Sequence, residues 1–432
     1  MVEIQRIGKN WLLAVLGFLA LAGCSRPSQP KFEPLQPQGV EGVADYRKLP
    51  LPASGATSPL ASSGSEVGVQ RRVSAQEIAQ REATLAELTN AIERDPDNAA
   101  AYFRRGAIYG EMGQHGRAIS DFGSVIRLDP ESYMAYVNRA EAHRERGDLD
   151  AAIADCNAAI RLNPLKWEAF GTRAKVHVVK GDYRRVVADC DEVLQINPQV
   201  ERAYAFRGLA HLRLKNLDRA IDDYSQAIRL NPADFYNYHN RACAYMQIGD
   251  FPAAIADCTQ ALRIDPTHIN SYWMRAEASS SRGDTEAAIA DHTEAIRLNP
   301  NKAASYYMRG RIYIKRNELD KAIADCTTSL RIDPQDADAY FCRAGAFFQL
   351  KRIEPAIADF SAAIRLRPDD ADLYVFRGGS YVATGQFDKA MADFDEALRL
   401  DPNSAKAERY RAMLVKLRRV AGRDEVDEQQ RR

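Results

Sequence analysis

The sequence predicts an all-α fold, a solenoid of stacked helical hairpins, and two observations lead to this class. Proline recurs every 34 residues from Pro96 to Pro402, at ten positions without a slip. Between successive prolines, small and apolar residues recur in two sets, each with the spacing of one face of a helix. A fixed period in this range indicates a repeat architecture in which each unit extends one continuous core.

Residues 303–336 represent the repeated unit. With Ala303 counted as position 1, the first set lies at positions 4, 8 and 11 and the second at positions 20, 24 and 27. At about 100° per residue each set covers a narrow stripe of a helix, so the unit is two helices joined by a turn. Small residues at positions 8 and 20 let the two helices approach closely, and Pro334 at position 32 ends the second one.

This pattern resembles that of the tetratricopeptide repeat family, W-x2-L-G-x2-Y followed by A-x3-F and P, and matches it at nearly every site. The resemblance covers residues 99–404 as nine full repeats and implies a right-handed α-solenoid of helix-turn-helix units. One departure is systematic, because position 7, leucine in the family pattern, is arginine in all nine repeats.

Residues 1–23 have the form of an export signal. Arg6 and Lys9 precede an apolar run over residues 11–21, and the segment closes on Leu-Ala-Gly-Cys with Cys24 last. It resembles a bacterial lipoprotein signal, which implies that Cys24 becomes the N-terminus and carries a lipid anchor with fatty acids such as palmitate. Ser25, rather than aspartate, favours the outer membrane. The alternatives are an ordinary secretory signal that contains a cysteine, or a buried apolar helix.

The rest of the chain divides by composition and periodicity. Proline, serine and glycine are frequent after Cys24 and no helical or strand period is present, which is typical of a disordered tether. Ser74 to Glu77 has the form of a capping box and begins the ordered part. We predict a tether over 24–72, a solenoid over 73–420 with capping helices at 74–95 and 405–419, and a charged, disordered tail over 421–432.

Composition indicates a folded protein whose main partner is not nucleic acid. Hydrophobic residues make up 46% and charged residues 27%, and 59 basic residues balance 59 acidic ones. Binding to phosphates needs a surplus of lysine and arginine, which this balance does not supply.

Seven cysteines are present, and no C-x-x-C motif occurs. Like positions in adjacent repeats lie on the order of 10 Å apart, too far for a disulfide bond, so we expect the six cysteines other than Cys24 to be free thiols that fill the core. Six free thiols are unexpected in an exported protein and argue against export.

Two ladders of polar residues run through the repeats. Arginine at position 7, from Arg105 to Arg377, and aspartate at position 23, from Asp121 to Asp393, occur in all nine. Because each arginine has an aspartate in the facing helix, we expect partly buried ion pairs, and the alternative is an anion-binding ladder.

Three histidines, His143, His177 and His211, occupy position 11 of successive repeats. They lie too far apart to share a metal ion, so we interpret them as core residues, with a pH-sensitive patch as the alternative. No phosphate loop, nucleophile elbow or carboxylate pair is visible. We therefore expect no catalytic site, metal, cofactor or small-molecule substrate.

The first-helix face at positions 2, 5, 9 and 12 is turned away from the core stripe. In the family this face, with positions 6 and 13, lines a groove that binds peptides. The alternative is that these side chains only pack against neighbouring repeats. The predicted groove residues are Phe206, His239, Asn240, Trp273, Met274, Tyr307, Met308, Phe341 and Phe376.

These features predict a non-enzymatic scaffold or adaptor for protein–protein interaction, tethered to a bacterial envelope membrane, with the periplasmic side of the outer membrane favoured. The expected partner is an extended or amphipathic helical segment of another protein. The alternative is an intracellular adaptor anchored in the inner membrane by its N-terminus. A third class, an enzyme, would need a catalytic domain, and the repeats leave no room for one.

Overall fold

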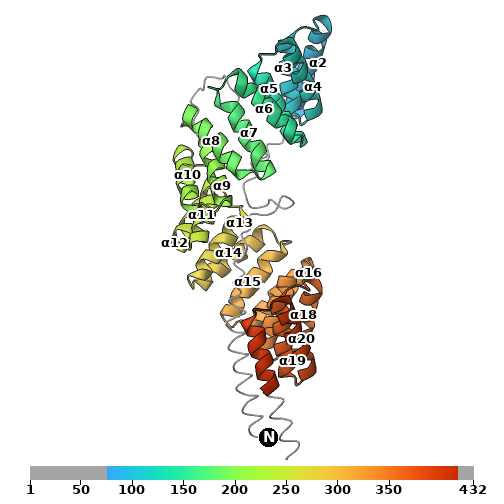
Figure 1. Cartoon of the computed structure of the whole chain (residues 1–432), viewed down its shortest axis with the longest axis vertical. Coiled ribbons are helices and arrows are strands. Elements are labelled where there is room, and N and C mark those ends of the chain that lie inside the picture. Colours follow the sequence, from blue (N-terminus) through green and yellow to red (C-terminus); the bar gives the residue numbers. More distant parts are fainter. Residues whose placement is uncertain (1–74, 417–432) are drawn as a thin grey trace, which may run out of the picture. The chain divides into compact units, whose positions relative to one another are not determined.

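The computed structural model describes residues 75–416, and this part of the chain contains helices and no strand (Figure 1). The described residues form two compact units, 75–271 and 272–416, and the division falls within the helix that spans Ile269–Ser281. The predicted signal segment, Cys24, the tether and the tail lie outside the described residues.

Each repeat contributes two helices of 13 or 14 residues. The first helices are α3 (Ala99–Glu111), α5 (Tyr133–Arg146), α7 (Trp167–Lys180), α9 (Glu201–Arg213), α11 (Phe235–Ile248), α13 (Ile269–Ser281), α15 (Ala303–Lys315), α17 (Ala337–Gln349) and α19 (Ala371–Ala383). The second helices are α4 (His115–Leu128), α6 (Leu149–Leu162), α8 (Tyr183–Ile196), α10 (Leu217–Leu230), α12 (Phe251–Ile264), α14 (Thr285–Leu298), α16 (Leu319–Ile332), α18 (Ile353–Leu366) and α20 (Phe387–Leu400). Before them lies α2 (Ala75–Arg94), and residues 405–416 are also helical.

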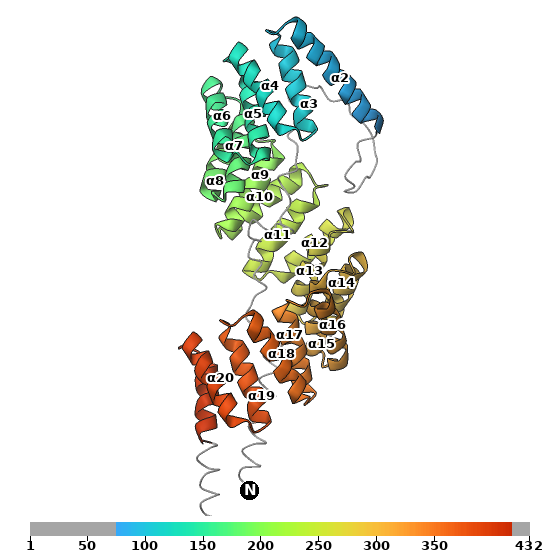
Figure 2. The same ribbon diagram turned by 90° about the vertical axis from the view of Figure 1, so that its right-hand side faces the viewer.

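Within each unit, helices that follow one another in the chain pack side by side (Figures 1 and 2). First helices of successive repeats also contact each other, as α5 contacts α7 and α15 contacts α17. Among residues 75–416, successive second helices within a unit do not contact each other to the extent that successive first helices do. The first helices therefore line the inner side of each unit, and the predicted fold class, a solenoid of helical hairpins, is confirmed.

The turn inside each repeat depends on a left-handed residue at position 15. In the nine described repeats this residue has φ between 58° and 91°, and six of the nine are glycine. Glycine adopts this conformation without the steric cost of a Cβ atom. The N–H of position 16 then donates to the carbonyl of position 11, as Asp148 donates to His143 at 2.9 Å. This bond satisfies a carbonyl that the end of the first helix leaves open.

The turn between repeats depends on the residue before the repeated proline. Position 31 is aspartate or asparagine except at Arg367, and its Oδ1 atom accepts a hydrogen bond from the N–H of position 33, as in Asp333 and Gln335 at 2.9 Å. Second helices end at position 30, directly before this turn. The proline has no N–H with which to continue the helix, so the predicted role of the proline is confirmed.

The core of a hairpin is a close contact between positions 8, 20 and 24. Position 20 is alanine, or Val186 in one repeat, and is fully buried in all nine. A large ring at position 24 lies against glycine at position 8 in three repeats: Gly106 with Phe122, Gly208 with Tyr224 and Gly378 with Phe394. In the fourth repeat with phenylalanine or tyrosine at position 24, Phe360 faces alanine, Ala344. The contact is tightest at Gly378, where a Cβ atom would lie 2.7 Å from Cε1 of Phe394.

This contact predicts that replacement of glycine by alanine has different effects on stability at two helical glycines of the same unit. Gly378→Ala should lower the free energy of unfolding by about 1–3 kcal/mol, because the buried ring of Phe394 has no room to retreat. Gly345→Ala, whose Cβ would meet nothing within 4 Å, should leave stability unchanged or raise it by up to about 1 kcal/mol. Urea unfolding of both variants measures the difference. Equal midpoints would show that the helix pair is not closely packed at this position.

Candidate protein-binding surface

The arginine at position 7 binds the aspartate at position 23 of its own repeat in all nine repeats. Arg275 is typical, since its Nε and Nη2 atoms donate to the carboxylate of Asp291 at 2.9 and 2.7 Å. The nine aspartates are buried, with exposed fractions of 4 to 8%. The predicted ion pairs are confirmed. Because the carboxylates already occupy the guanidinium groups, the geometry favours a structural role over the anion-binding alternative.

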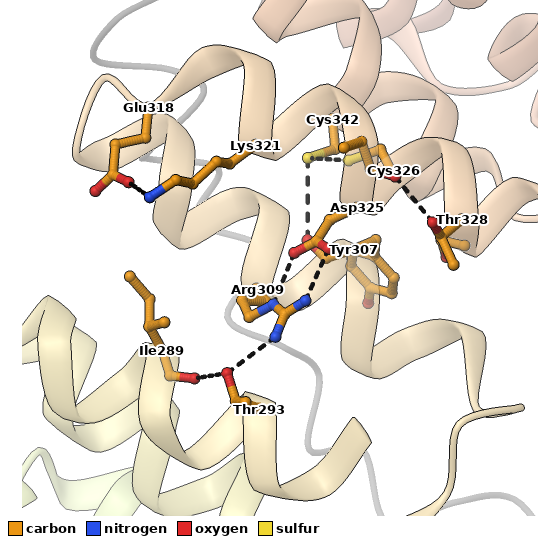
Figure 3. Close-up of polar contacts among 12 residues, drawn as sticks. Ile289, Thr293, Tyr307, Arg309, Glu318, Lys321, Asp325, Cys326, Thr328 and Cys342 are labelled. Atoms are coloured by element: carbon orange, nitrogen blue, oxygen red, sulfur yellow. Dashed lines mark hydrogen bonds and ion pairs between the residues drawn. The ribbon is translucent and has the colours of Figure 1, made fainter. Parts of the chain in front are cut away.

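Ladder arginines also reach the preceding repeat and nearby aromatic rings. Arg309 donates from Nη1 to Oγ1 of Thr293 at 2.9 Å, in addition to its pair with Asp325 (Figure 3). Arg343 lies over the rings of Tyr340 and Phe347, at positions 4 and 11, with distances of 5.8 and 5.9 Å to the ring centroids. Arginine can replace the leucine of the family pattern here because its stem packs between rings while its head is paired with a carboxylate.

The three histidines at position 11 lie beside the ladder. Their Nε2 atoms are 3.9 to 4.0 Å from the aspartates of their own repeats. His177 and His211 are buried, and burial lowers the pKa of both imidazoles despite the nearby carboxylates. The interpretation of these two as core residues is confirmed, and His143 is half-buried.

Removing one arginine of the ladder should destabilise the fold more than removing a surface arginine. Arg275→Ala leaves the buried carboxylate of Asp291 without its partner, and we expect a loss of about 3 kcal/mol in the free energy of unfolding. Arg297→Ala, which breaks a solvent-exposed pair with Glu294, should cost less than about 1 kcal/mol. Chemical denaturation of the two variants makes the comparison, and equal losses would mean that water already screens the ladder.

The predicted groove residues in unit 75–271 are buried. Phe206, His239 and Asn240 are 4%, 2% and 1% exposed. The Nδ1 atom of His239 lies 3.0 Å from Oγ of Ser271 in the next first helix. A partner that approaches the inner side does not reach these side chains, so their assignment as contact residues needs correction to inter-repeat packing.

The predicted groove residues in unit 272–416 differ in how far they are buried. Met274 and Phe376 are buried, at 2% and 4% exposure. Trp273, Tyr307 and Phe341, the aromatic row at position 5, are half-buried.

Each ring of this row contacts the repeat that follows. Trp273 donates from Nε1 to Oγ of Ser305 at 3.0 Å, and the ring of Phe341 lies 5.0 Å from that of Phe376. Tyr307 packs against the cluster of Ile314 and Cys342, and its burial raises the pKa of its hydroxyl. These contacts are the ones expected under the alternative, in which position 5 packs against neighbouring repeats, because successive first helices lie in contact there.

The remaining predicted residue, Met308, begins a partly exposed stripe along α15. Met308, Arg311 and Lys315 share one face of this helix by their spacing, and all three are half-buried. Lys315 donates from Nζ to Oγ of Ser280 on α13 at 2.7 Å, which places the stripe on the inner side between two first helices. Sequence reasoning did not name Arg311 and Lys315, although positions 9 and 13 are part of the groove in the family.

In unit 75–271, a cluster of buried charged residues occupies part of the inner side. Lys175 and Arg144, 2% and 5% exposed, both bind Glu141, at 3.1 and 2.9 Å. Burial opposes the ionised form of Glu141, but the two cations outweigh it and hold the pKa of this carboxyl below its usual value. This cluster links α5 to α7 and was not predicted from the sequence.

From residue 75 to residue 416, no helix has both the length and the apolar character needed to cross a membrane. Over the same residues, no group of three or more His, Cys, Asp or Glu side chains is arranged to hold a metal ion.

Sequence comparison identifies the class of protein that this repeat geometry defines. Five family models, each described as tetratricopeptide repeat, match residues 87–120, 108–166, 201–234, 237–268, 273–337, 310–377 and 371–404. The chain belongs to the tetratricopeptide repeat family. This fold is typically a non-catalytic scaffold that binds other proteins or peptides, and the repeats support an interaction scaffold here. No curated protein matches the chain.

Solved structures share parts of the architecture. YrrB, described as a TPR protein with an unusual peptide-binding site, is 20% identical with a TM-score of 0.37, over 45% of this chain and all of that one. A tetratricopeptide repeat protein from Parabacteroides merdae is 19% identical with a TM-score of 0.43, over 66% of this chain and 99% of that one. Yeast Tom70 is 20% identical with a TM-score of 0.37, over 74% and 80%. The family assignment rests on the repeat models and not on these partial likenesses.

Proposed function

We propose that this protein is a non-enzymatic adaptor that captures a segment of a partner protein on the inner side of residues 272–416. The observation that carries the proposal is the α15 stripe of Met308, Arg311 and Lys315, which the packing of the repeats leaves partly exposed. An apolar side chain followed by two cations on the same face of a helix is suited to a segment with both apolar and acidic groups. The partner segment is extended or forms an amphipathic helix.

We further propose that a lipid on Cys24 holds the repeats at a bacterial envelope membrane, on the periplasmic side and in the outer membrane. The support is the sequence of residues 1–24, with its basic start, apolar run and closing cysteine. The second candidate is an intracellular adaptor anchored in the inner membrane by its N-terminus. The unusual number of cysteines favours this second location. A protease added outside osmotically opened cells cleaves the repeats in the first case and spares them in the second.

The inner-side site predicts unequal effects of two charge-matched variants. Arg311→Ala with Lys315→Ala should reduce capture of the partner from detergent-solubilised membranes by about tenfold or more, or about 1.4 kcal/mol. Arg297→Ala with Lys321→Ala removes the same charge from second helices and should leave capture unchanged. Partners are quantified by mass spectrometry after affinity purification of the full chain.

Thermal unfolding of both double variants serves as the control for folding. Equal capture by both would place the binding site outside the α15 stripe. Variants of Trp273 or Tyr307 are less suitable, because these side chains also hold successive repeats together.

The anchor predicts a change in fractionation. Cys24→Ala removes the thiol that would receive the lipid, so the protein should become soluble or remain unprocessed, since stable anchoring needs two or more acyl chains. Membrane flotation after a high-salt wash, with the apparent mass on gels, measures both effects. A variant that still floats with normal processing would contradict lipidation at Cys24.

A further inference from the structure

Two cysteines from successive repeats meet inside unit 272–416. Cys326 on α16 and Cys342 on α17 place their sulfur atoms 2.9 Å apart (Figure 3). Both are buried, at 0% and 4% exposure. The separation exceeds the length of a disulfide bond, about 2.0 Å, by only about 0.9 Å.

The sequence expectation that no two cysteines come this close is wrong for this pair. That expectation compared like positions in adjacent repeats, whereas Cys326 lies at position 24 of one repeat and Cys342 at position 6 of the next. The second helix of one repeat packs directly on the first helix of the next, as α16 packs on α17. Unlike positions can therefore meet although like positions remain far apart.

The residue opposite the pair leaves room for both sulfur atoms. In the other three repeats with cysteine at position 24, position 8 is alanine: Ala140 with Cys156, Ala174 with Cys190 and Ala242 with Cys258. In the repeat of Cys326, position 8 is Gly310. A Cβ atom there would lie 2.9 Å from Sγ of Cys326 and 3.6 Å from Sγ of Cys342. The glycine thus provides the space in which the two thiols face each other.

We propose that Cys326 and Cys342 form a disulfide bond that joins α16 to α17 when the chain folds in an oxidising medium. A small-molecule disulfide is the oxidant. The thiolate of one cysteine attacks it and releases one small thiol, and the other cysteine then attacks the mixed disulfide and releases the second. The two cysteines lose two electrons and two protons, and the oxidant becomes two thiols.

Burial determines when this reaction takes place. In the folded unit neither sulfur is open to a small disulfide, and burial raises the pKa of the Cys326 thiol well above its usual value. The thiolate is the reactive form, so exchange in the closed core is slow. The first exchange therefore takes place before α16 packs on α17, and the second takes place as packing brings the two sulfur atoms together. The closed core afterwards shields the bond from reductants.

This inference does not rest on the proposed function, because it needs neither a partner nor a lipid anchor. A disulfide bond between Cys326 and Cys342 would also remove two of the six free thiols that argue against export. The redox state of this pair in cells also reports the compartment in which the repeats fold, since disulfide bonds persist in oxidising compartments and are rare in reducing ones.

The test is a peptide map of the full chain. The protein is unfolded and reduced, then refolded with a mixture of reduced and oxidised glutathione, and its thiols are alkylated under denaturing conditions. We expect two fewer alkylated thiols than in a sample refolded with reductant, and a linked pair of peptides that contain Cys326 and Cys342. Alkylation of both cysteines, or linkage of either one to a different cysteine, would overturn the proposal.

Variants and melting give a second readout. Cys342→Ser should lose the linked peptides, whereas Cys190→Ala, which removes a buried cysteine of the other unit, should keep them. The melting temperature of the refolded wild-type protein should fall when it is reduced in denaturant and refolded, and that of Cys342→Ser should not change. Equal melting of the reduced and oxidised wild-type protein would contradict a bond that constrains the unfolded chain.

Discussion

The arginine at position 7 is the interaction on which the repeats depend, because one side chain joins three parts of the array. Arg377 shows this most fully. It binds Asp393 of its own second helix, reaches Ser361 of the preceding repeat and lies between the rings of Tyr374 and Tyr381, at positions 4 and 11. A buried carboxylate is costly without its partner, so these positions are coupled. Where the preceding repeat offers Gly123, a Cβ atom would lie 3.7 Å from Nη1 of Arg139, in the place that a side chain fills elsewhere.

These coupled contacts determine which side chains on the inner side stay partly exposed. The ladder and the contact of positions 8, 20 and 24 use the core side of each hairpin, and position 5 packs against the following first helix. The inner side that remains exposed is a narrow strip, of which Arg311 and Lys315 are examples. Under the proposed function, substitutions in this strip would change recognition without disturbing the repeated contacts, which would let one fold serve many partners.

The 34-residue period was sufficient to predict the solenoid, because a fixed period indicates stacked units. The pattern inside one unit was sufficient to predict the helical hairpin and the pairing of Arg275 with Asp291, because these depend on contacts inside one repeat. Two features depend on contacts between repeats, and the pattern within a unit does not specify them. The burial of Phe206 and Met274 follows from the approach of successive first helices, and the proximity of Cys326 and Cys342 follows from the packing of α16 on α17. Of the predicted groove residues, only Met308 belongs to the exposed α15 stripe, and the use of this surface in binding remains a prediction.

The central claim is that a partner lies on the inner side of residues 272–416, and site-specific photo-crosslinking in living cells tests it most directly. A photoreactive phenylalanine analogue replaces Met308 on α15 in one variant and Lys321, an exposed residue of α16, in the other. The account predicts that a discrete protein crosslinks to the chain through position 308 and not through position 321. Crosslinks of the same protein from position 321 alone, or from both positions equally, would contradict it.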